Sequence, residues 1–96
     1  RAQPWKGRGQ SPPSEDAVTV LDVRGRAADE ALDMVTMALD RAVLAGAQTL
    51  RIIHGHGTGR LRQALREYLK TSPYVESFRS GERLEGGDGV TIVELK

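Results

Sequence analysis

The sequence predicts a small α/β domain with the element order βαβαββ, in which helices pack on an open mixed sheet. Short β-branched runs that end in turn residues indicate the strands. Two longer segments repeat apolar residues at steps of three and four, which is typical of helices with one buried stripe. The last two apolar runs have no helix between them, so we expect these strands to pair antiparallel. A chain of 96 residues has room for one such core.

Residues 1–16 differ in composition from the rest of the chain. They contain three prolines, two glycines and very few apolar side chains. Such a segment buries too little surface to offset its ordering entropy, so we predict a disordered linker before a folded domain at 17–96. Trp5 is the exception in this linker, and we expect it to be solvated.

Residues 17–25 predict the first strand. Apolar residues occupy both alternating registers of this segment, which is typical of a strand covered on both faces. Gly25 ends the run. Asp22 and Arg24 are therefore expected at the carboxyl end of the first strand.

The first helix is predicted from about residue 27 to residue 45. Asp29 and Glu30 fall in its first turn, where the helix dipole favours acids, and Gly46 is suited to end it. Its apolar stripe consists of Ala28, Ala31, Leu32, Val35, Ala38, Leu39, Ala42 and Val43.

A glycine-rich turn, His-Gly-His-Gly-Thr-Gly at positions 54–59, follows the second predicted strand at 49–54. Its glycines allow positive φ and close approach of a ligand. Thr58 is suited to cap the next helix, whose first amides would then point outward. Those amides and the helix dipole favour negative charge, so the turn predicts a phosphate site. The glycine spacing differs from the dinucleotide and P-loop fingerprints.

The second helix is predicted at 59–71, with Pro73 closing it, and the last strands at 74–79 and 89–95 with a loop at 81–88 between them. Apolar residues of this helix face the core, and basic residues repeat every four positions on its other side. The expected buried residues are Leu61, Ala64, Leu65, Tyr68 and Leu69, and the basic residues are Arg62, Arg66 and Lys70.

Charge is distributed unevenly, although the net charge is only +1. The first helix is acidic and the second is basic, which indicates one positive face. A basic stripe is most often solvated surface, but this one begins beside the glycine turn, which favours contact with phosphate.

Several classes are excluded by what the chain lacks. It has no cysteine, which excludes a disulfide scaffold and cysteine metal sites. No apolar run approaches the roughly 18 residues of a membrane span, and no signal-peptide pattern is present. We therefore expect no membrane partner and a cytoplasmic location. The chain opens on Arg rather than Met, so we expect a fragment of a longer protein.

Parallel first and second strands would bring Asp22, Arg24 and His54 to one rim of the sheet, where open sheets bind ligands. An acid, an imidazole, a guanidinium and helix amides suit the cleavage of a phosphodiester. His54 is then the candidate general acid or base. Asp22 could orient that imidazole, activate water or hold a metal. Arg24, Arg60 and the turn amides would stabilise the transition-state charge.

Alternatives remain open for each residue. Asp22 could simply pair with Arg24, and His54 could be a strand-end histidine satisfied by backbone groups. A metal site of His54, His56 and Asp22 is a further alternative, which spacing alone supports weakly. We assign no metal ligand. The candidate substrate- or phosphate-binding residues are Arg24, Gly55, His56, Gly57, Thr58, Gly59, Arg60, Arg62 and Arg66.

Three segments in this order resemble the signature of the Smr (small MutS-related) domain: LDVRG at 21–25, HGHGTG at 54–59 and GGDGVT at 86–91. The resemblance covers about Val20 to Lys96. Residues 74–79 and 93–96 are most similar to the C-terminal Smr domain of the bacterial second MutS paralogue. That relative opposes homologous recombination and has been linked to rescue of collided ribosomes.

This resemblance implies a two-layer α+β fold, with a four-stranded mixed sheet packed by two helices, like the C-terminal domain of translation initiation factor three. It also implies DNA-nicking endonuclease activity in recombination or repair. Asp22, Arg24 and His54 match positions suspected of catalysis or substrate binding. His56 occupies a variable position that is often Lys or Arg, so the charge there depends on pH in this chain.

The resemblance further implies that a longer MutS-like ATPase chain lies N-terminal to this domain. Its expected partner is DNA, branched or linear, and the alternative is RNA or the ribosome. Family members differ in metal requirement, so the use of a divalent metal such as Mg or Mn stays open. The rival function is a non-catalytic module that binds nucleic acid or ribosomes.

Overall fold

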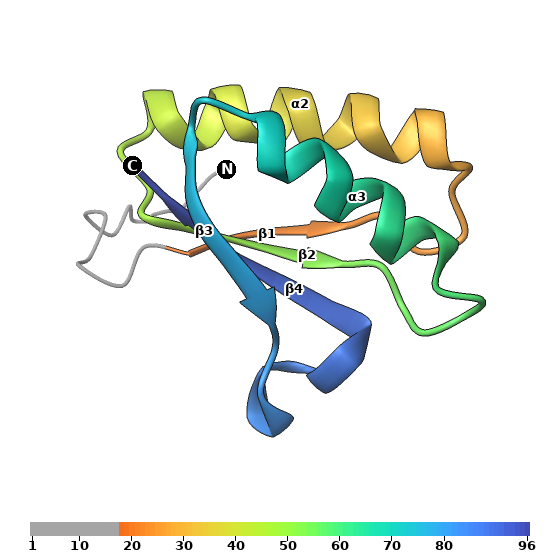
Figure 1. The fold of residues 1–96 in the computed structure, drawn as a ribbon. Coiled ribbons are helices and arrows are strands. Elements are labelled where there is room, and N and C mark those ends of the chain that lie inside the picture. The colour runs from red at the N-terminus through yellow and green to blue at the C-terminus, as the bar shows by residue number, and fades with distance from the viewer. Residues whose placement is uncertain (1–17) are drawn as a thin grey trace, which may run out of the picture.

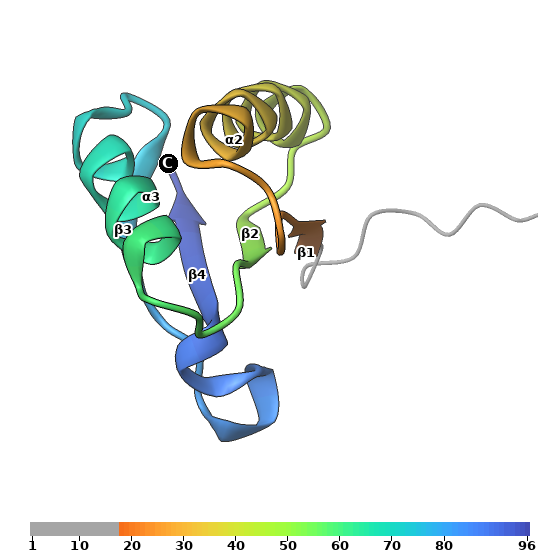
Figure 2. The ribbon, with the colours of Figure 1, turned by 90° about the vertical axis from the view of Figure 1, so that its right-hand side faces the viewer.

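The computed structural model describes residues 18–96, so the linker expected at 1–16, including Trp5, lies outside the described residues. The elements follow in the predicted order: β1 (Val18–Asp22), α2 (Ala28–Leu44), β2 (Thr49–Ile53), α3 (Arg60–Thr71), β3 (Val75–Ser80) and β4 (Val90–Leu95). Two 3₁₀ turns, η1 (Arg83–Glu85) and η2 (Gly87–Gly89), occupy the connection from β3 to β4. Figures 1 and 2 show both helices on the same face of the sheet. The predicted two-layer fold is confirmed.

The four strands lie in the order β1-β2-β4-β3. β1 and β2 are parallel, whereas β4 is antiparallel to both β2 and β3, as expected for last strands joined without a helix. Because β4 lies between β2 and β3, its first residues are next to the carboxyl end of β2. The carboxyl ends of β1 and β2 and the start of β4 therefore lie side by side at one end of the sheet, which is the rim.

The core lies between the sheet and the two helices. Leu39 of α2, Leu65 of α3 and Leu50 and Ile52 of β2 are fully buried. Both predicted helical stripes face this core, although two members of the α2 stripe do not: Ala28, at the start of the helix, is exposed, and Val43, near its end, is 40% exposed. Gly46, with φ of 76°, follows α2 as predicted, and its amide donates to the carbonyl of Val43. No helix among residues 18–96 is long and apolar enough to span a membrane.

The prediction that the first strand is covered on both faces is wrong. Both helices pack on one side, so Val20 is 53% exposed on the other side of the sheet. Ile92 on that open face is nevertheless buried. It lies in register between Arg51 and Arg79, and long arginine stems cover apolar neighbours. Apolar residues in both registers of β1 therefore did not indicate a second layer.

Candidate nucleic-acid site at the glycine turn

The three signature segments meet at the rim, the end of the sheet where β1 and β2 finish and β4 begins. The carbonyl of Gly89 accepts the amides of both His54 and Gly55, at 3.0 and 2.9 Å. The stem of Arg24 lies over Gly55, where a Cβ would be 3.5 Å from Arg24 Cγ. The His56 ring lies over Gly89, where a Cβ would be 3.1 Å from His56 Cε1. Backbone and side-chain contacts thus hold the three segments together.

The glycine turn delivers the chain into α3. Gly55, Gly57 and Gly59 all have positive φ, of 78°, 44° and 84°. Gly59 rather than Thr58 is the N-cap, because residue 59 adopts the left-handed conformation that glycine allows. Thr58 still contributes, since its Oγ1 accepts the amide of Arg60 at 3.4 Å. The first amides of α3 lack intrahelical partners, as at any helix start, and favour an anion there.

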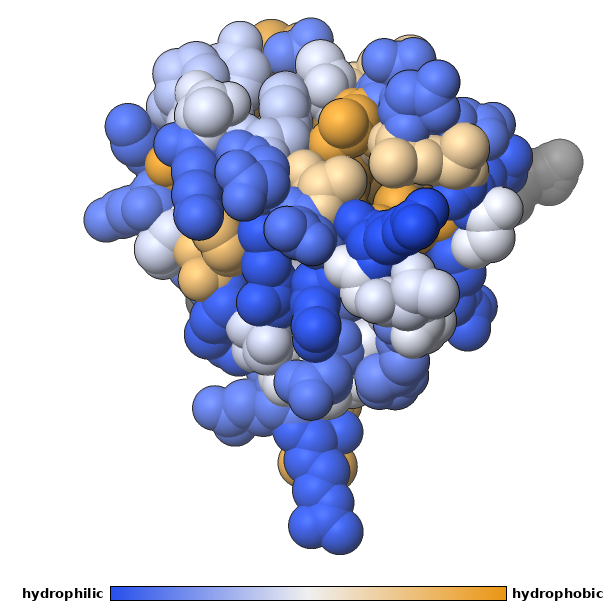
Figure 3. Space-filling model, turned by 45° about the vertical axis from the view of Figure 1, so that its right-hand side comes forward, coloured by the Kyte–Doolittle hydropathy of each residue, from blue (hydrophilic) through white to orange (hydrophobic). Residues whose placement is uncertain are grey.

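A hollow of about 380 Å³ lies against this turn. Figure 3 looks toward α3 and the turn and shows a mostly hydrophilic surface with a smaller apolar cluster. The basic groups around the hollow make it suitable for phosphate. Its lining consists of Gly25, Arg26, Ala28, His54, Gly55, His56, Gly57, Thr58, Gly59, Arg60, Leu61 and Arg62.

His54 is only 5% exposed, and both of its ring nitrogens are engaged. Nδ1 lies 2.8 Å from the carbonyl oxygen of Gly55, which can only accept, so Nδ1 carries a proton. Nε2 then accepts the hydroxyl of Thr91 at 2.9 Å. Burial lowers the pKa of His54, and the nearby charges of Arg66, Arg62 and His56 lower it further against the opposing effect of the Gly55 bond. The imidazole is therefore neutral at pH 7.

Thr91 connects His54 to α3. Its side chain is fully buried, and its Oγ1 also lies 3.4 Å from Arg66 Nη2. The same nitrogen of Arg66 donates to Ser80 Oγ at 2.8 Å. This network ties β2, β4, β3 and α3 together below the turn. Sequence reasoning missed Thr91 and Ser80, since their place in the network depends on strand register.

Asp22 and Arg24 form an exposed ion pair on the opposite face of the sheet from His54. Asp22 pairs in register with Ile53, so its side chain points away from the helix-facing side. Arg24 donates to the Asp22 carboxylate through its amide, Nε and Nη2, and the Nη2 bond to Oδ2 is 2.7 Å long. These bonds lower the pKa of Asp22 to about 2, so it is ionised at neutral pH.

The structure therefore separates two residues that we expected to act together. Asp22 does not orient the His54 imidazole, because the Gly55 carbonyl does so. Nor do His54, His56 and Asp22 form a metal site. Among residues 18–96 there is no group of three or more His, Cys, Asp or Glu side chains that could hold a metal. The predicted rim exists, but its acid and its buried imidazole lie on different faces.

The lowered pKa of His54 predicts how stability depends on pH. In the pH window just below 6.5, the ordinary histidine value, the unfolded chain takes up a proton at position 54 before the folded chain does. The free energy of unfolding should therefore fall as the pH is lowered through this window. Asp22 and Glu85, whose pKa values are about 2, contribute losses only at lower pH. Urea unfolding midpoints at several pH values measure this, and His54→Gln should flatten the dependence. An equal slope in wild type and variant would contradict it.

The sequence pattern of the Smr domain family matches residues 21–96. The chain belongs to the Smr domain family. It is 54% identical over 76 residues to an endonuclease MutS2 of Anaeromyxobacter sp. (strain Fw109-5), and the aligned residues make up 79% of this chain and 9% of that protein. It is 55% identical over 76 residues to an endonuclease MutS2 of Geobacillus kaustophilus (strain HTA426), where the aligned residues make up 79% of this chain and 10% of that protein.

Solved structures agree with this membership. The Smr domain of Thermus thermophilus MutS2 superposes with a TM-score of 0.80 at 49% identity, over 81% of this chain and 98% of that chain. YdaL, a stand-alone small MutS-related protein from Escherichia coli, gives a TM-score of 0.76 at 23% identity, which shows the shared fold. It covers 81% of this chain and 64% of that chain. This Smr domain spans about a tenth of the length of its MutS2 relatives.

Proposed function

We propose that this Smr domain is the DNA-nicking endonuclease module of a longer MutS2-like protein that acts in recombination or repair. The names of its relatives, each an endonuclease MutS2, support a nuclease. The observation that carries the proposal is the convergence of the three signature segments on one rim. There the Gly89 carbonyl holds the glycine turn, and Arg24 lies directly beside that turn at Gly55.

Phosphate capture is assigned to the basic groups and amides of this rim. Arg24 is 63% exposed in its side chain and is held in one orientation by Asp22. Arg60, Arg62 and His56 line the adjoining hollow together with the start of α3. Guanidinium groups and helix amides bind phosphate oxygens and stabilise the charge that develops when the phosphodiester is cleaved.

We assign Asp22 the role of accepting a proton from the attacking water. In the reaction the water oxygen bonds to phosphorus and gives a proton to Asp22, the bond from phosphorus to one strand oxygen breaks, and that oxygen takes up a proton from solvent. A phosphate bound to Arg24 competes with Asp22 for the guanidinium and frees carboxylate oxygens to accept the proton of the water. Because the Asp22 pKa is about 2, this side chain is ionised at neutral pH and has no proton to donate.

A divalent metal fits this rim only if the protein and the substrate phosphates share its coordination. Mg²⁺ in nucleic-acid enzymes is held by one or two carboxylates together with substrate phosphates. Asp22, with a side chain 44% exposed, is the carboxylate that would hold it here, and the bound metal would supply electrophilic assistance at phosphorus.

His54 is assigned a positioning role. Its burial and its two hydrogen bonds favour support of the turn through Gly55 and Thr91 over direct proton transfer. The sequence-based hypothesis of direct acid–base chemistry at His54 stays a prediction that mutation can test.

A non-catalytic module that binds nucleic acid or ribosomes is the second candidate function. One observation favours it: both acid–base candidates are already engaged, Asp22 by Arg24 and His54 by Gly55 and Thr91. The basic side chains of α3 would serve binding equally well. The two functions differ in whether a phosphodiester is cut.

Nicking of supercoiled plasmid by the 96-residue chain tests the proposal. Wild type should convert supercoiled DNA to the open circle, and Arg24→Ala should lower that rate by about 100-fold, the scale for losing one preorganised donor to developing charge. Arg41→Ala, which removes an exposed charge from α2, is the matched control and should nick like wild type. Parallel samples with EDTA show whether a divalent metal is needed.

Two outcomes count against nicking at this rim. Equal rates for Arg24→Ala and wild type would mean that another site or a contaminant cuts the plasmid. If wild type does not nick but still retards DNA in a gel, the binding module is the function.

A further inference from the structure

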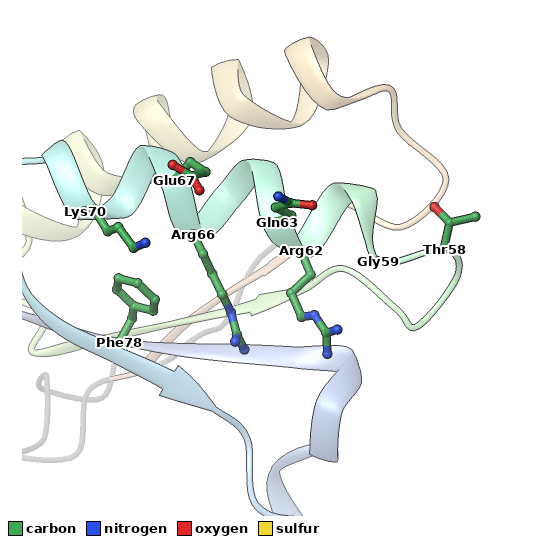
Figure 4. A pocket seen from close by; sticks show the side chains of 8 residues that line it. All are labelled: Thr58, Gly59, Arg62, Gln63, Arg66, Glu67, Lys70 and Phe78. Atoms are coloured by element: carbon green, nitrogen blue, oxygen red, sulfur yellow. The ribbon is translucent and has the colours of Figure 1, made fainter.

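A groove of about 660 Å³ runs between α3 and the edge strand β3. It is separate from the hollow at the glycine turn, although Thr58, Gly59 and Arg62 line both. A ligand lying along the groove would therefore lead directly to the turn. Figure 4 shows the groove with its lining residues: Thr58, Gly59, Arg62, Gln63, Arg66, Glu67, Lys70 and Phe78.

One wall of the groove carries a row of positive charge. Arg62, Arg66 and Lys70 extend from α3 toward the sheet in Figure 4, and Glu67 is the one acid in the lining. Eight residues of helix separate the ends of the row, or about 12 Å at the usual helical rise. Arg66 is held in place by its bonds to Ser80 and Thr91, so this charge is preorganised. A linear polyanion matches such a row.

The other wall supplies an aromatic ring. Phe78 of β3 is half-buried, packs against the core with part of its surface and lines the groove with the rest. Figure 4 places its ring below Lys70, on the side toward which the basic side chains extend. An aromatic ring beside a basic track is the arrangement that stacks an unpaired base while cations follow the backbone.

This combination distinguishes a single strand from a duplex. The bases of a duplex are paired and stacked, so a ring in the wall of a groove meets only sugar and phosphate. An unpaired strand can turn a base onto the ring and keep its phosphates on the arginines. The groove also leads to the rim to which phosphate capture is assigned, through the three lining residues that it shares with the hollow there.

We infer that the groove between α3 and β3 binds an unpaired polynucleotide strand, with Phe78 stacking a base and Arg62 and Lys70 holding the backbone. Combined with nicking at the rim, such a groove selects substrates that contain single-stranded segments next to the rim. This selection rests on the proposed function.

Fluorescence anisotropy of labelled oligothymidylate of about 15 nucleotides, within the usual range of single-strand sites, tests the groove. A duplex of the same length is measured in parallel, and EDTA is present throughout. Wild type should bind the single strand more tightly than the duplex. Phe78→Leu keeps an apolar side chain in the core but removes the ring, and should weaken single-strand binding by about 10-fold or more, with duplex binding unchanged. Phe78→Tyr, which keeps the ring, should restore wild-type affinity.

Salt dependence tests the basic wall. Arg62→Ala and Lys70→Ala should each lower the slope of log affinity against log salt by about 0.7 on the single strand, whereas the control Arg41→Ala should not. Thermal midpoints show whether each variant is folded. The inference is overturned if wild type binds duplex as tightly as single strand, or if folded Phe78→Leu binds the single strand like wild type. Because the readout is binding and not nicking, a failure of nicking leaves this result intact.

Discussion

Asp22→Asn is expected to lower the rate of plasmid nicking by about 100- to 10,000-fold, which is the contribution of a positioned proton acceptor. Asparagine keeps the size of the side chain and can still accept a bond from Arg24, but it cannot take a proton from water. The thermal midpoint should change little, because the Asp22–Arg24 pair is solvent-exposed and such pairs contribute little stability. Rates measured from the appearance of open-circle plasmid give the effect.

Asp33→Asn is the matched control for this variant. It removes the same charge from an exposed position on α2, away from the rim, and should nick like wild type. If Asp22→Asn also nicks like wild type, the carboxylate has no part in the chemistry and Asp22 serves only to pair with Arg24.

His54→Ala should lower the free energy of unfolding by about 1–3 kcal/mol, because it leaves the buried Thr91 hydroxyl without its acceptor. Nicking should fall with it, since the turn loses its anchor at Gly55. His54→Gln separates positioning from proton transfer. Its side-chain oxygen can accept the Thr91 hydroxyl, yet an amide does not titrate, so we expect stability and most of the nicking to be retained. Urea unfolding and plasmid nicking are measured on both variants.

The glutamine variant decides which role His54 has. A folded His54→Gln domain that loses nicking by about 100-fold or more would show direct proton transfer, as the sequence predicted, and would contradict the positioning role. If both variants lose nicking only in proportion to the fraction of unfolded protein, His54 contributes to stability and has no further role in nicking.

The order of elements and the place of the rim follow from local sequence features. Apolar spacing predicted α2 and α3 to within about a residue at each end, and turn residues such as Gly46 predicted where elements stop. The parallel pairing of β1 with β2 then placed Asp22 and the glycine turn at one edge of the sheet. These predictions succeed because helical periodicity and turn conformations depend on residues close together in the chain.

Relations across strands could not be read in the same way. Register pairs Asp22 with Ile53, and this single pairing puts Asp22 and His54 on opposite faces of the sheet. The position of β4 between β2 and β3 brings Thr91 to His54 and Gly89 to the turn. Each of these contacts joins residues more than thirty positions apart, so no local pattern reports it.

The sequence of this Smr domain is enough to specify its elements, its family signature and the edge at which the signature gathers, because each depends on local pattern. The pairing of side chains at that edge, the exposed second face of the sheet and the groove beside Phe78 depend on strand order, register and one-sided helix packing. Those are properties of the assembled sheet, in which a shift of one residue reverses the face of every side chain.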